Sequence, residues 1–270
     1  MTAVAARVAE FRQLHAAGCF VIPNPWDLGS ARRLVQFGFP ALATTSSGFA
    51  WSIGRKDNHA TLEHVLAHLR LIANGVTVPV SADFEGGFAI EPEQVAVNVT
   101  AASATGIAGL SIEDSTGDDA APLFEFPLAL ERIQAARRAI DDSGTGILLT
   151  ARSEGFVAGR PDLNETIRRL TAYAEAGADC LFAPGIRTAA EISAIVTAVA
   201  PKPVNVLVMG DLLTVQQLAD AGARRISVGG GLARAAWTGF LEAAGEIARQ
   251  GTFSAIARAT PSREIHGAFE

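Results

Sequence analysis

Acidic side chains follow a short apolar run at residues 78–88, which reads Val-Pro-Val-Ser-Ala-Asp-Phe-Glu-Gly-Gly-Phe. Asp83 and Glu85 are two residues apart, and on an extended segment such side chains point the same way. We therefore expect both carboxylates to face one pocket. Mg²⁺ prefers oxygen ligands of this kind, and it typically keeps waters and uses one or two carboxylates. The alternative is a solvated acidic turn closed by the glycine pair.

Other apolar runs also end in polar or small residues. Together these ends carry many acids, one fixed cation, and no Cys nucleophile, Schiff-base Lys or Ser-His-Asp order. Such a set is suited to holding Mg²⁺ against a substrate carboxylate and oxo group, while metal and Arg stabilise the negative oxygen of a forming enolate. The residues at these ends are Asp27, Ser47, Gly48, Asp83, Glu85, Glu113, Arg152 and Asn205.

The elements that must position these residues are short strands alternating with helices, without a linker between them. Repeated units of roughly 30 residues favour a parallel sheet, and eight of them closing on themselves predict one (β/α)₈ TIM barrel domain over residues 1–270. A doubly wound open sheet is the alternative. The predicted strands are 19–22, 41–45, 78–82, 109–112, 146–151, 180–182, 203–208 and 225–228, and the predicted helices are 4–17, 28–37, 62–73, 91–104, 127–140, 163–176, 189–198, 215–221 and 233–248.

Composition limits the classes of partner. The net charge of −6 argues against a nucleic-acid ligand, because phosphate binding needs a surplus of Lys and Arg. The two cysteines, Cys19 and Cys180, are far apart and favour buried thiols in a reducing compartment. The first residues lack the apolar centre of a signal peptide, and no apolar run is long enough to span a membrane. We therefore expect a cytoplasmic protein with a small-molecule substrate.

The order of the polar blocks resembles the isocitrate lyase/phosphoenolpyruvate mutase superfamily, over about residues 10 to 250. The resemblance is to its carboxyphosphonoenolpyruvate phosphonomutase-like branch. The blocks that carry it are Ser47-Gly48, Gly54-Arg55-Lys56-Asp57, Ser81-Ala82-Asp83-Phe84-Glu85-Gly86-Gly87, Ser111-Ile112-Glu113-Asp114 and Thr150-Ala151-Arg152-Ser153-Glu154.

The resemblance implies a Mg²⁺-dependent (β/α)₈ barrel, with Mn²⁺ as a substitute, that makes or breaks C–C or P–C bonds beside a carboxylate. It also implies a homodimer or homotetramer that exchanges the last helix between subunits. Carried over by position, the substrate carboxylate is held by Thr45, Ser47, Gly48 and, as a weaker match, Asn205. The catalytic residues are Asp57, Glu113 and Arg152, and the metal acids are Asp83, Glu85 and Glu113.

Two departures from the superfamily pattern narrow the reaction. Ser81 stands where the strand-three motif usually begins with Asp, so that Glu85 is the candidate to compensate. Residues 116–125 read Thr-Gly-Asp-Asp-Ala-Ala-Pro-Leu-Phe-Glu, without the Cys and His that isocitrate and methylisocitrate lyases carry there. They also lack the Lys-Thr-Asn stretch typical of phosphonate-forming mutases.

We therefore expect a lyase or decarboxylase that cleaves a C–C bond in a small 2-oxo or 2-hydroxy (di)carboxylate through an enolate-like intermediate. The alternatives are a phosphonomutase acting on phosphoenolpyruvate or a carboxyphosphonate, and a barrel that binds a carboxylate without catalysis. The alternative to a catalytic role for Arg152 is a structural role as an ion-pair partner of Glu113 or Glu154. For His64 and His68 we favour exposed or packed helix residues over metal ligands, and for residues 229–231 a tight turn over a phosphate cradle.

Overall fold

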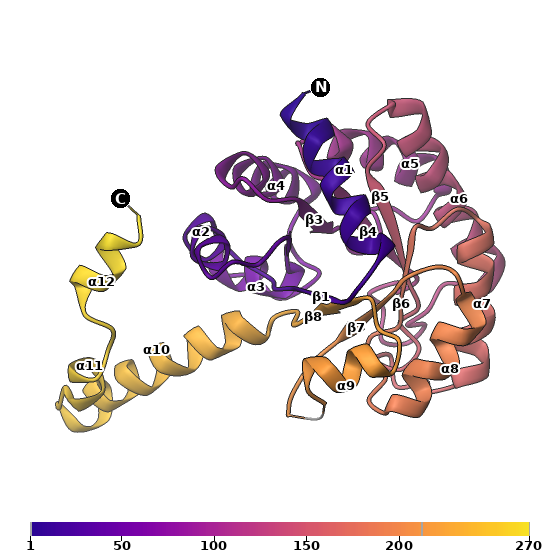
Figure 1. Ribbon diagram of the computed structural model, residues 1–270. Helices are drawn as coiled ribbons and strands as arrows, with labels where there is room; N and C mark the ends of the chain where they lie inside the picture. The colour runs from indigo at the N-terminus through magenta and orange to yellow at the C-terminus, as the bar shows by residue number, and fades with distance from the viewer. Residues whose placement is uncertain (1, 212, 270) are drawn as a thin grey trace.

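Eight parallel strands form a nearly closed barrel surrounded by helices, in a computed structural model that describes residues 2–211 and 213–269 (Figure 1). The strand order is β1-β8-β7-β6-β5-β4-β3-β2, and a backbone hydrogen bond of 3.1 Å from Ala43 N to Pro23 O joins the two ends. The predicted (β/α)₈ barrel is thereby confirmed. The strands are β1 Phe20–Ile22, β2 Leu42–Ala43, β3 Val80–Asp83, β4 Gly109–Glu113, β5 Leu148–Arg152, β6 Cys180–Phe182, β7 Val204–Leu207 and β8 Arg225–Ser227.

Seven of the helices begin where the sequence supplies a side-chain cap. Thr2, Asp27, Thr45, Thr61, Asp162, Thr188 and Thr214 each accept a backbone N–H at a helix start, which satisfies donors that the helix itself leaves open. The helices are α1 Ala3–Ala16, α2 Leu28–Gln36, α3 Ser46–Ser52, α4 Leu62–Gly75, α5 Pro92–Ser103, α6 Phe126–Ser143, α7 Leu163–Glu175, α8 Ala189–Val199, α9 Val215–Asp220, α10 Gly231–Gln250, α11 Ser254–Ala257 and α12 Ser262–Gly267.

The apolar core lies between the strands and the surrounding helices. On β4, Leu110 and Ile112 are fully buried in this core, whereas the alternate residues Ser111 and Glu113 line cavities. Side chains on a strand alternate between its two faces, so each strand feeds the outer core with one face and the barrel interior with the other. This alternation puts the polar residues of the strands inside the barrel.

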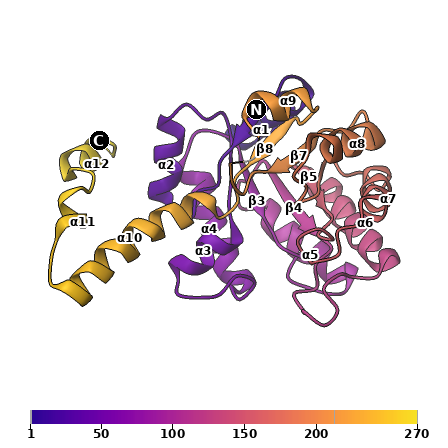
Figure 2. The same cartoon turned by 90° about the horizontal axis from the view of Figure 1, so that it is seen from below.

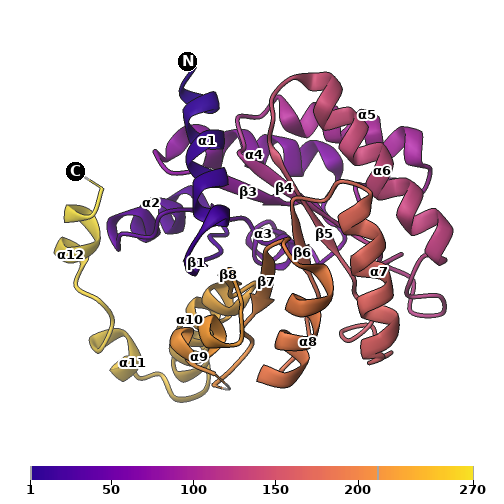
Figure 3. The same ribbon diagram turned by 45° about the vertical axis from the view of Figure 1, so that its right-hand side comes forward.

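The ends of the chain have different surroundings. Helix α1 lies in front of the strands in Figures 1 and 3, and its buried Phe11 packs against Gly109 at the start of β4. Helix α10 leaves the barrel, and α11 and α12 lie beyond it (Figures 1 and 2). Among the described residues, no helix combines the length and apolarity needed to cross a bilayer.

Candidate active site

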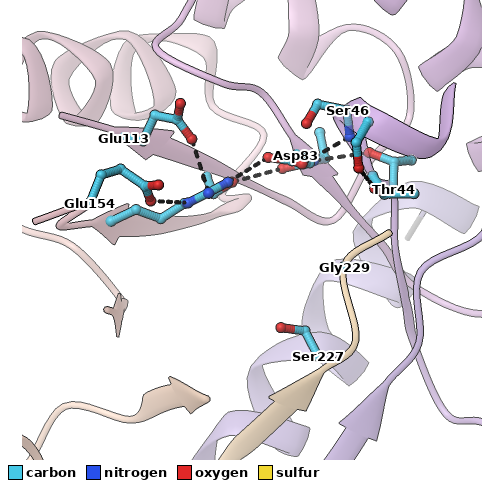
Figure 4. A network of polar contacts seen from close by, with 12 residues as sticks. Thr44, Ser46, Asp83, Glu113, Glu154, Ser227 and Gly229 are labelled. Atoms are coloured by element: carbon cyan, nitrogen blue, oxygen red, sulfur yellow. Dashed lines mark hydrogen bonds and ion pairs between the residues drawn. The ribbon is translucent and has the colours of Figure 1, made fainter. Parts of the chain in front are cut away.

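Arg152 is the centre of an ion-pair network at the carboxyl ends of β3, β4 and β5 (Figure 4). Its Nη1 lies 2.7 Å from Oδ1 of Asp83, its Nη2 lies 3.1 Å from Oε2 of Glu113, and its Nε donates to Oε1 of Glu154 at 2.9 Å. Three nitrogens of one guanidinium thus contact three different carboxylates. Because the fork is planar, these contacts fix its orientation.

The strand register explains why the network forms. Glu113 and Arg152 are paired neighbours on β4 and β5, and Asp83 ends the adjacent β3. The guanidinium carbon also lies 5.1 Å from the ring centre of Phe182 on β6, within cation–π range. The parallel sheet therefore delivers the predicted acid and cation side chains to one place, as their positions at strand ends required.

Negative charge exceeds positive charge in this network. Burial raises the pKa of Glu113 well above its usual range, and the nearby Glu154 and Asp83 raise it further, against the opposing effect of Arg152. Burial also raises the pKa of Glu154, which Arg152 opposes and Asp114 reinforces. Arg152 stays charged, because its acidic neighbours outweigh burial and raise its pKa. The site can therefore accept a further cation or hold a proton between its carboxylates.

Asp83 also joins the network to α3. Its Oδ2 accepts the backbone N–H of Ser46 at 2.9 Å, and its own N–H donates to Oγ1 of Thr44 at 2.9 Å. Residues 46–48 form the first turn of a short helix, which Thr45 caps by accepting from Gly48 N. Sequence reasoning missed this helix because its small polar residues are typical of turns.

Thr45, Ser47 and Gly48 lie in this first turn of α3. Thr45 Oγ1 and Ser47 Oγ are 3.1 Å apart. A Cβ added to Gly48 would lie 2.7 Å from Cγ2 of Thr45 and 3.0 Å from Cβ of Trp26, so glycine there lets α3 pack closely. The role of the three residues in binding a carboxylate stays a prediction.

Glu85 lies beyond β3 and not on it. The strand ends at Asp83, and Glu85 has a φ of 48° within the following turn, so the alternation expected from the sequence stops before it. Asp83 lines a cavity of about 80 Å³ inside the barrel, whereas Glu85 and Glu113 line a neighbouring cavity of about 440 Å³. The two acids of the motif therefore face different spaces.

The charges of the motif acids still influence one another. Burial, followed by the charges of Asp83 and Asp57, raises the pKa of Glu85 to about 8. Loss of solvent around its carboxylate and the charge of Asp83 also raise the pKa of Asp57, although its loop is exposed. Asp57 thus belongs to the same group of acids, on the outer side of the site.

A hard divalent cation fits this donor set. Mutual repulsion of Asp57, Asp83 and Glu85 would be relieved by a positive charge between them, and only carboxylate oxygens and waters would be needed. Within residues 2–211 and 213–269, no three Asp, Glu, His or Cys side chains are already grouped as a metal cage. The arrangement is therefore suited to a cation held largely through water.

Asn205 lies deeper in the barrel than the Arg152 network. It is fully buried, its Nδ2 donates to Ser227 Oγ at 2.9 Å, and its Oδ1 accepts from Nε of Arg225 at 2.8 Å. Sequence reasoning placed Asn205 among the site residues but missed Arg225. Arg225 begins β8, whose sequence is Arg-Ile-Ser, and nothing in that sequence distinguishes a buried Arg from the exposed Arg that is usual in proteins.

Other sequence expectations concern neighbouring segments. His68 is buried and stacks on Phe49 with ring centres 4.0 Å apart, which supports the packed interpretation. The turn after β8 is held by Oδ1 of Asn24, which accepts the N–H groups of Val228 and Gly229 at 2.9 Å each. One of the N–H groups expected for a phosphate cradle is thus already used, in agreement with a structural turn.

Comparisons with known proteins agree with this geometry. The family model described as phosphoenolpyruvate phosphomutase matches residues 11–248. A solved candidate lyase/mutase from Burkholderia cenocepacia J2315 is 46% identical, with a TM-score of 0.96, and the match covers 99% of this chain and 98% of that one. A solved candidate phosphonomutase from the same strain is 35% identical, with a TM-score of 0.83 and coverages of 90% and 99%. The oxaloacetate decarboxylase of Bradyrhizobium diazoefficiens is 27% identical over 192 residues, 68% of this chain and 65% of the relative.

Proposed function

This chain belongs to the phosphoenolpyruvate phosphomutase family, a family of lyases and mutases, and from that we propose that it is a Mg²⁺-dependent carbon–carbon lyase. Its substrate is a small 2-oxo or 2-hydroxy dicarboxylate of the oxaloacetate type, and the cleavage is a decarboxylation or a retro-aldol step. The similarity to an oxaloacetate decarboxylase supports the decarboxylation.

The main support for the proposal is that three carboxylates form ion pairs with the guanidinium of Arg152. A guanidinium has five N–H donors, and one contact at each nitrogen leaves a donor on Nη1 and another on Nη2 for a ligand. When the C–C bond beside a carbonyl breaks, its electron pair moves towards the carbonyl oxygen, which becomes negative. A fixed Arg152 stabilises that charge, at a scale of about 10²–10³ in rate for one such donor.

Asp83, Glu85 and Glu113 are the residues that would hold Mg²⁺ or Mn²⁺, and Asp57 adds negative charge beside Asp83 and Glu85. The ion would supply Lewis acidity at the substrate oxygens. The chain itself supplies the surplus of negative charge around it, visible as the raised pKa values of Asp57 and Glu85. Glu85 is the candidate to compensate for the Asp that the superfamily pattern has at the position of Ser81, although it does so from the neighbouring cavity.

The first turn of α3 is the proposed cradle for the substrate carboxylate. Thr45 and Ser47 supply hydroxyl groups 3.1 Å apart, next to the Ser46 N–H that already holds Asp83. Gly48 lets this turn pack against Trp26, and Asn205 on β7 is a further candidate contact for the substrate carboxylate. The candidate acid–base groups are Asp57 and Glu113, because both have raised pKa values and lie beside Asp83 or Arg152.

Phosphonomutase chemistry is the second candidate, favoured by the 35% identity to a candidate phosphonomutase. Both reactions develop a negative oxygen beside a carboxylate and use the same Arg152 site. They differ in what the loop after β4 contributes. That loop is closed by an antiparallel bridge between Ser115 and Leu123, and Thr116 Oγ1 donates to Ala121 O at 2.6 Å.

The test is turnover of a panel of keto and hydroxy diacids with Mg²⁺, oxaloacetate first, followed by NMR. An enzyme-free Mg²⁺ blank and Arg152→Lys serve as controls, because Lys keeps the charge but not the planar fork. Product formation that depends on Arg152 supports the lyase. Interconversion of P–O and P–C signals in ³¹P NMR would instead establish the mutase, and binding without turnover by either route would leave a carboxylate-binding barrel.

We further propose that the barrel is a single domain and that α10 is exchanged between subunits of a homodimer or homotetramer. Helix α10 extends away from its own barrel (Figures 1 and 2), and it exposes apolar side chains. Phe240 and Leu241 have 58% and 60% of their surface exposed. Large apolar side chains at this exposure on one helix favour a protein partner.

A further inference from the structure

The inside of this barrel is only partly apolar. Barrel interiors are usually filled by Val, Ile and Leu, but here the cavity of about 80 Å³ is bordered by hydroxyl, amide, guanidinium and carboxylate groups as well as by apolar residues such as Ile22 and Leu207. It extends from Arg152 and Asp83 at the strand ends to Arg225 on β8. Figure 4 shows Ser227 and Gly229 of the same cavity across from the Arg152 network. The other polar residues that border it are Asn24, Thr44, Ser81, Ser111 and Asn205.

Arg225 has neutral partners. Its side chain is almost fully buried, with 4% of the residue exposed, and its Nε donates to Oδ1 of Asn205 at 2.8 Å. Its Nη1 lies 3.4 Å from Nε2 of His15. His15 Nδ1 lies 2.7 Å from the Phe11 carbonyl and must donate to it, which leaves Nε2 as an acceptor. Burial and the charge of Arg225 lower the pKa of His15 to about 3, so His15 is neutral at pH 7.

No acidic group balances the charge of Arg225 among the described residues. None of the ion pairs in that part of the chain includes it. The nearby Cys180 thiol does not serve either, because burial raises its pKa and keeps it protonated. Arg152 is a second cation acting on Arg225. A buried charge without a counter-ion is costly, which is why such groups are normally paired.

We propose that this interior cavity is a carboxylate-binding subsite in which Arg225 receives the second carboxylate of the substrate. The proposal rests on the lyase function proposed above and assigns the place where the second carboxylate of its dicarboxylate substrate binds. One carboxylate binds at the first turn of α3, beside Arg152 and Asp83, and the other reaches into the barrel. There the guanidinium of Arg225 and the hydroxyls of Ser81 and Ser227 donate to it, so that an anion supplies the charge that the protein lacks.

The binding test uses malonate, a dicarboxylate without a reactive keto group, and acetate as its monocarboxylate counterpart. In wild-type protein with Mg²⁺, calorimetry should show malonate bound at least ~10-fold more tightly than acetate. Arg225→Gln should weaken malonate by about 10- to 100-fold, the range of a lost hydrogen bond to a charged group, and leave acetate unchanged. Equal malonate affinity in wild type and Arg225→Gln would overturn the proposal.

Two further variants separate the subsite from general effects. Arg224→Gln removes the same charge one residue earlier, outside the residues that border the cavity, and should bind malonate like the wild type. Ser111→Val fills the cavity without changing its charge and should also weaken malonate. The Ser111→Val variant therefore tests the subsite even if Arg225→Gln does not fold. Malonate binding as tight in Ser111→Val as in wild type would contradict the subsite.

Crystals soaked in sodium bromide locate the anion directly. The expected result is an anomalous peak beside Arg225 that disappears when malonate is added. A cavity without bromide, or bromide that remains when malonate is bound, would overturn the proposal. Bromide that remains would show that the site binds a free anion and not a carboxylate of malonate. Neither measurement requires turnover, so a failed subsite can be told apart from a failed lyase assignment.

Discussion

Arg152 Nη1 lies 2.7 Å from Oδ1 of Asp83, although the two residues are 69 positions apart and come from β5 and β3. Asp83 accepts from the backbone of Ser46 with its other oxygen. A single carboxylate thus connects the cation of the site to the start of α3. Disturbing either partner should therefore affect both the orientation of the guanidinium and the proposed substrate cradle.

Replacing Arg152 tests the electrostatic role. We expect Arg152→Lys to reduce kcat/KM at least ~10²-fold, because Lys cannot contact three carboxylates and a ligand in one plane. Steady-state kinetics on oxaloacetate measure this loss. Arg168→Lys, on the exposed side of α7, is the matched control and should keep wild-type rates. If Arg152 only held the strands together, Arg152→Lys would lower the melting temperature while leaving the rate of the folded protein unchanged.

Removing divalent metal should abolish turnover, and Mg²⁺ or Mn²⁺ should restore it. Asp83→Asn and Asp57→Asn should raise the Mg²⁺ concentration needed for half-maximal activity, because each removes a negative charge from the group of acids. Activity titrations with Mg²⁺ after treatment with a chelator measure the change. Asp118→Asn, in the exposed loop after β4, is the control. Full activity in the chelated enzyme would exclude a metal requirement.

Glu85 should make the metal-free protein less stable as pH rises. Its folded pKa of about 8 exceeds the usual value of 4.5, so the folded state retains a proton that the unfolded state has lost. The stabilising effect is complete below about pH 4.5 and disappears as pH rises to about 8. Across this range the free energy of unfolding falls by at most about 1.4 kcal/mol for each pH unit.

Glu85→Gln removes that dependence. In chelator-containing buffer, urea unfolding from pH 5 to 8 should give a flatter stability profile for the variant, with its largest advantage near pH 8. Glu93→Gln, in the first turn of α5, controls for loss of one acid. A wild-type profile with the same slope as Glu85→Gln would mean that Glu85 titrates normally.

Gly48→Ala should destabilise the protein by about 1–3 kcal/mol, the cost of overpacking. The added Cβ would lie 2.7 Å from Cγ2 of Thr45, 3.0 Å from Cβ of Trp26 and 3.2 Å from Cβ of Ala233. Gly231→Ala is the matched control, because its Cβ would meet Val228 at 3.9 Å, an ordinary contact. Thermal unfolding compares the two. A Gly48→Ala variant as stable as Gly231→Ala would show that α3 can move without cost.

Charged substitutions on α10 test the assembly. Phe240→Asp and Leu241→Asp should shift the protein towards smaller species in analytical ultracentrifugation, because a buried, unpaired charge opposes association. Val97→Asp is the control, since Val97 is 61% exposed on α5, away from α10. An unchanged sedimentation profile for the α10 variants would show that these side chains lie outside any subunit contact.

The sequence by itself determined the barrel and much of the candidate site. Strand and helix periodicity gave the eight alternating units, and the position of Asp83, Glu113 and Arg152 at strand ends was enough to bring them together, because parallel strands end at the same face of a barrel. This inference needs no side-chain geometry. It therefore holds even though the observed strands are shorter than some of those predicted.

Only the tertiary structure decided which cavity each acidic side chain of the candidate site faces. Asp83 and Glu85 face different cavities because the strand ends between them and the chain turns with a positive φ. The uncompensated Arg225 could not be recognised either, since its partners His15 and Asn205 are 210 and 20 positions away. Sequence periodicity specifies which face of a strand a residue occupies, whereas charge balance depends on every segment packed around it.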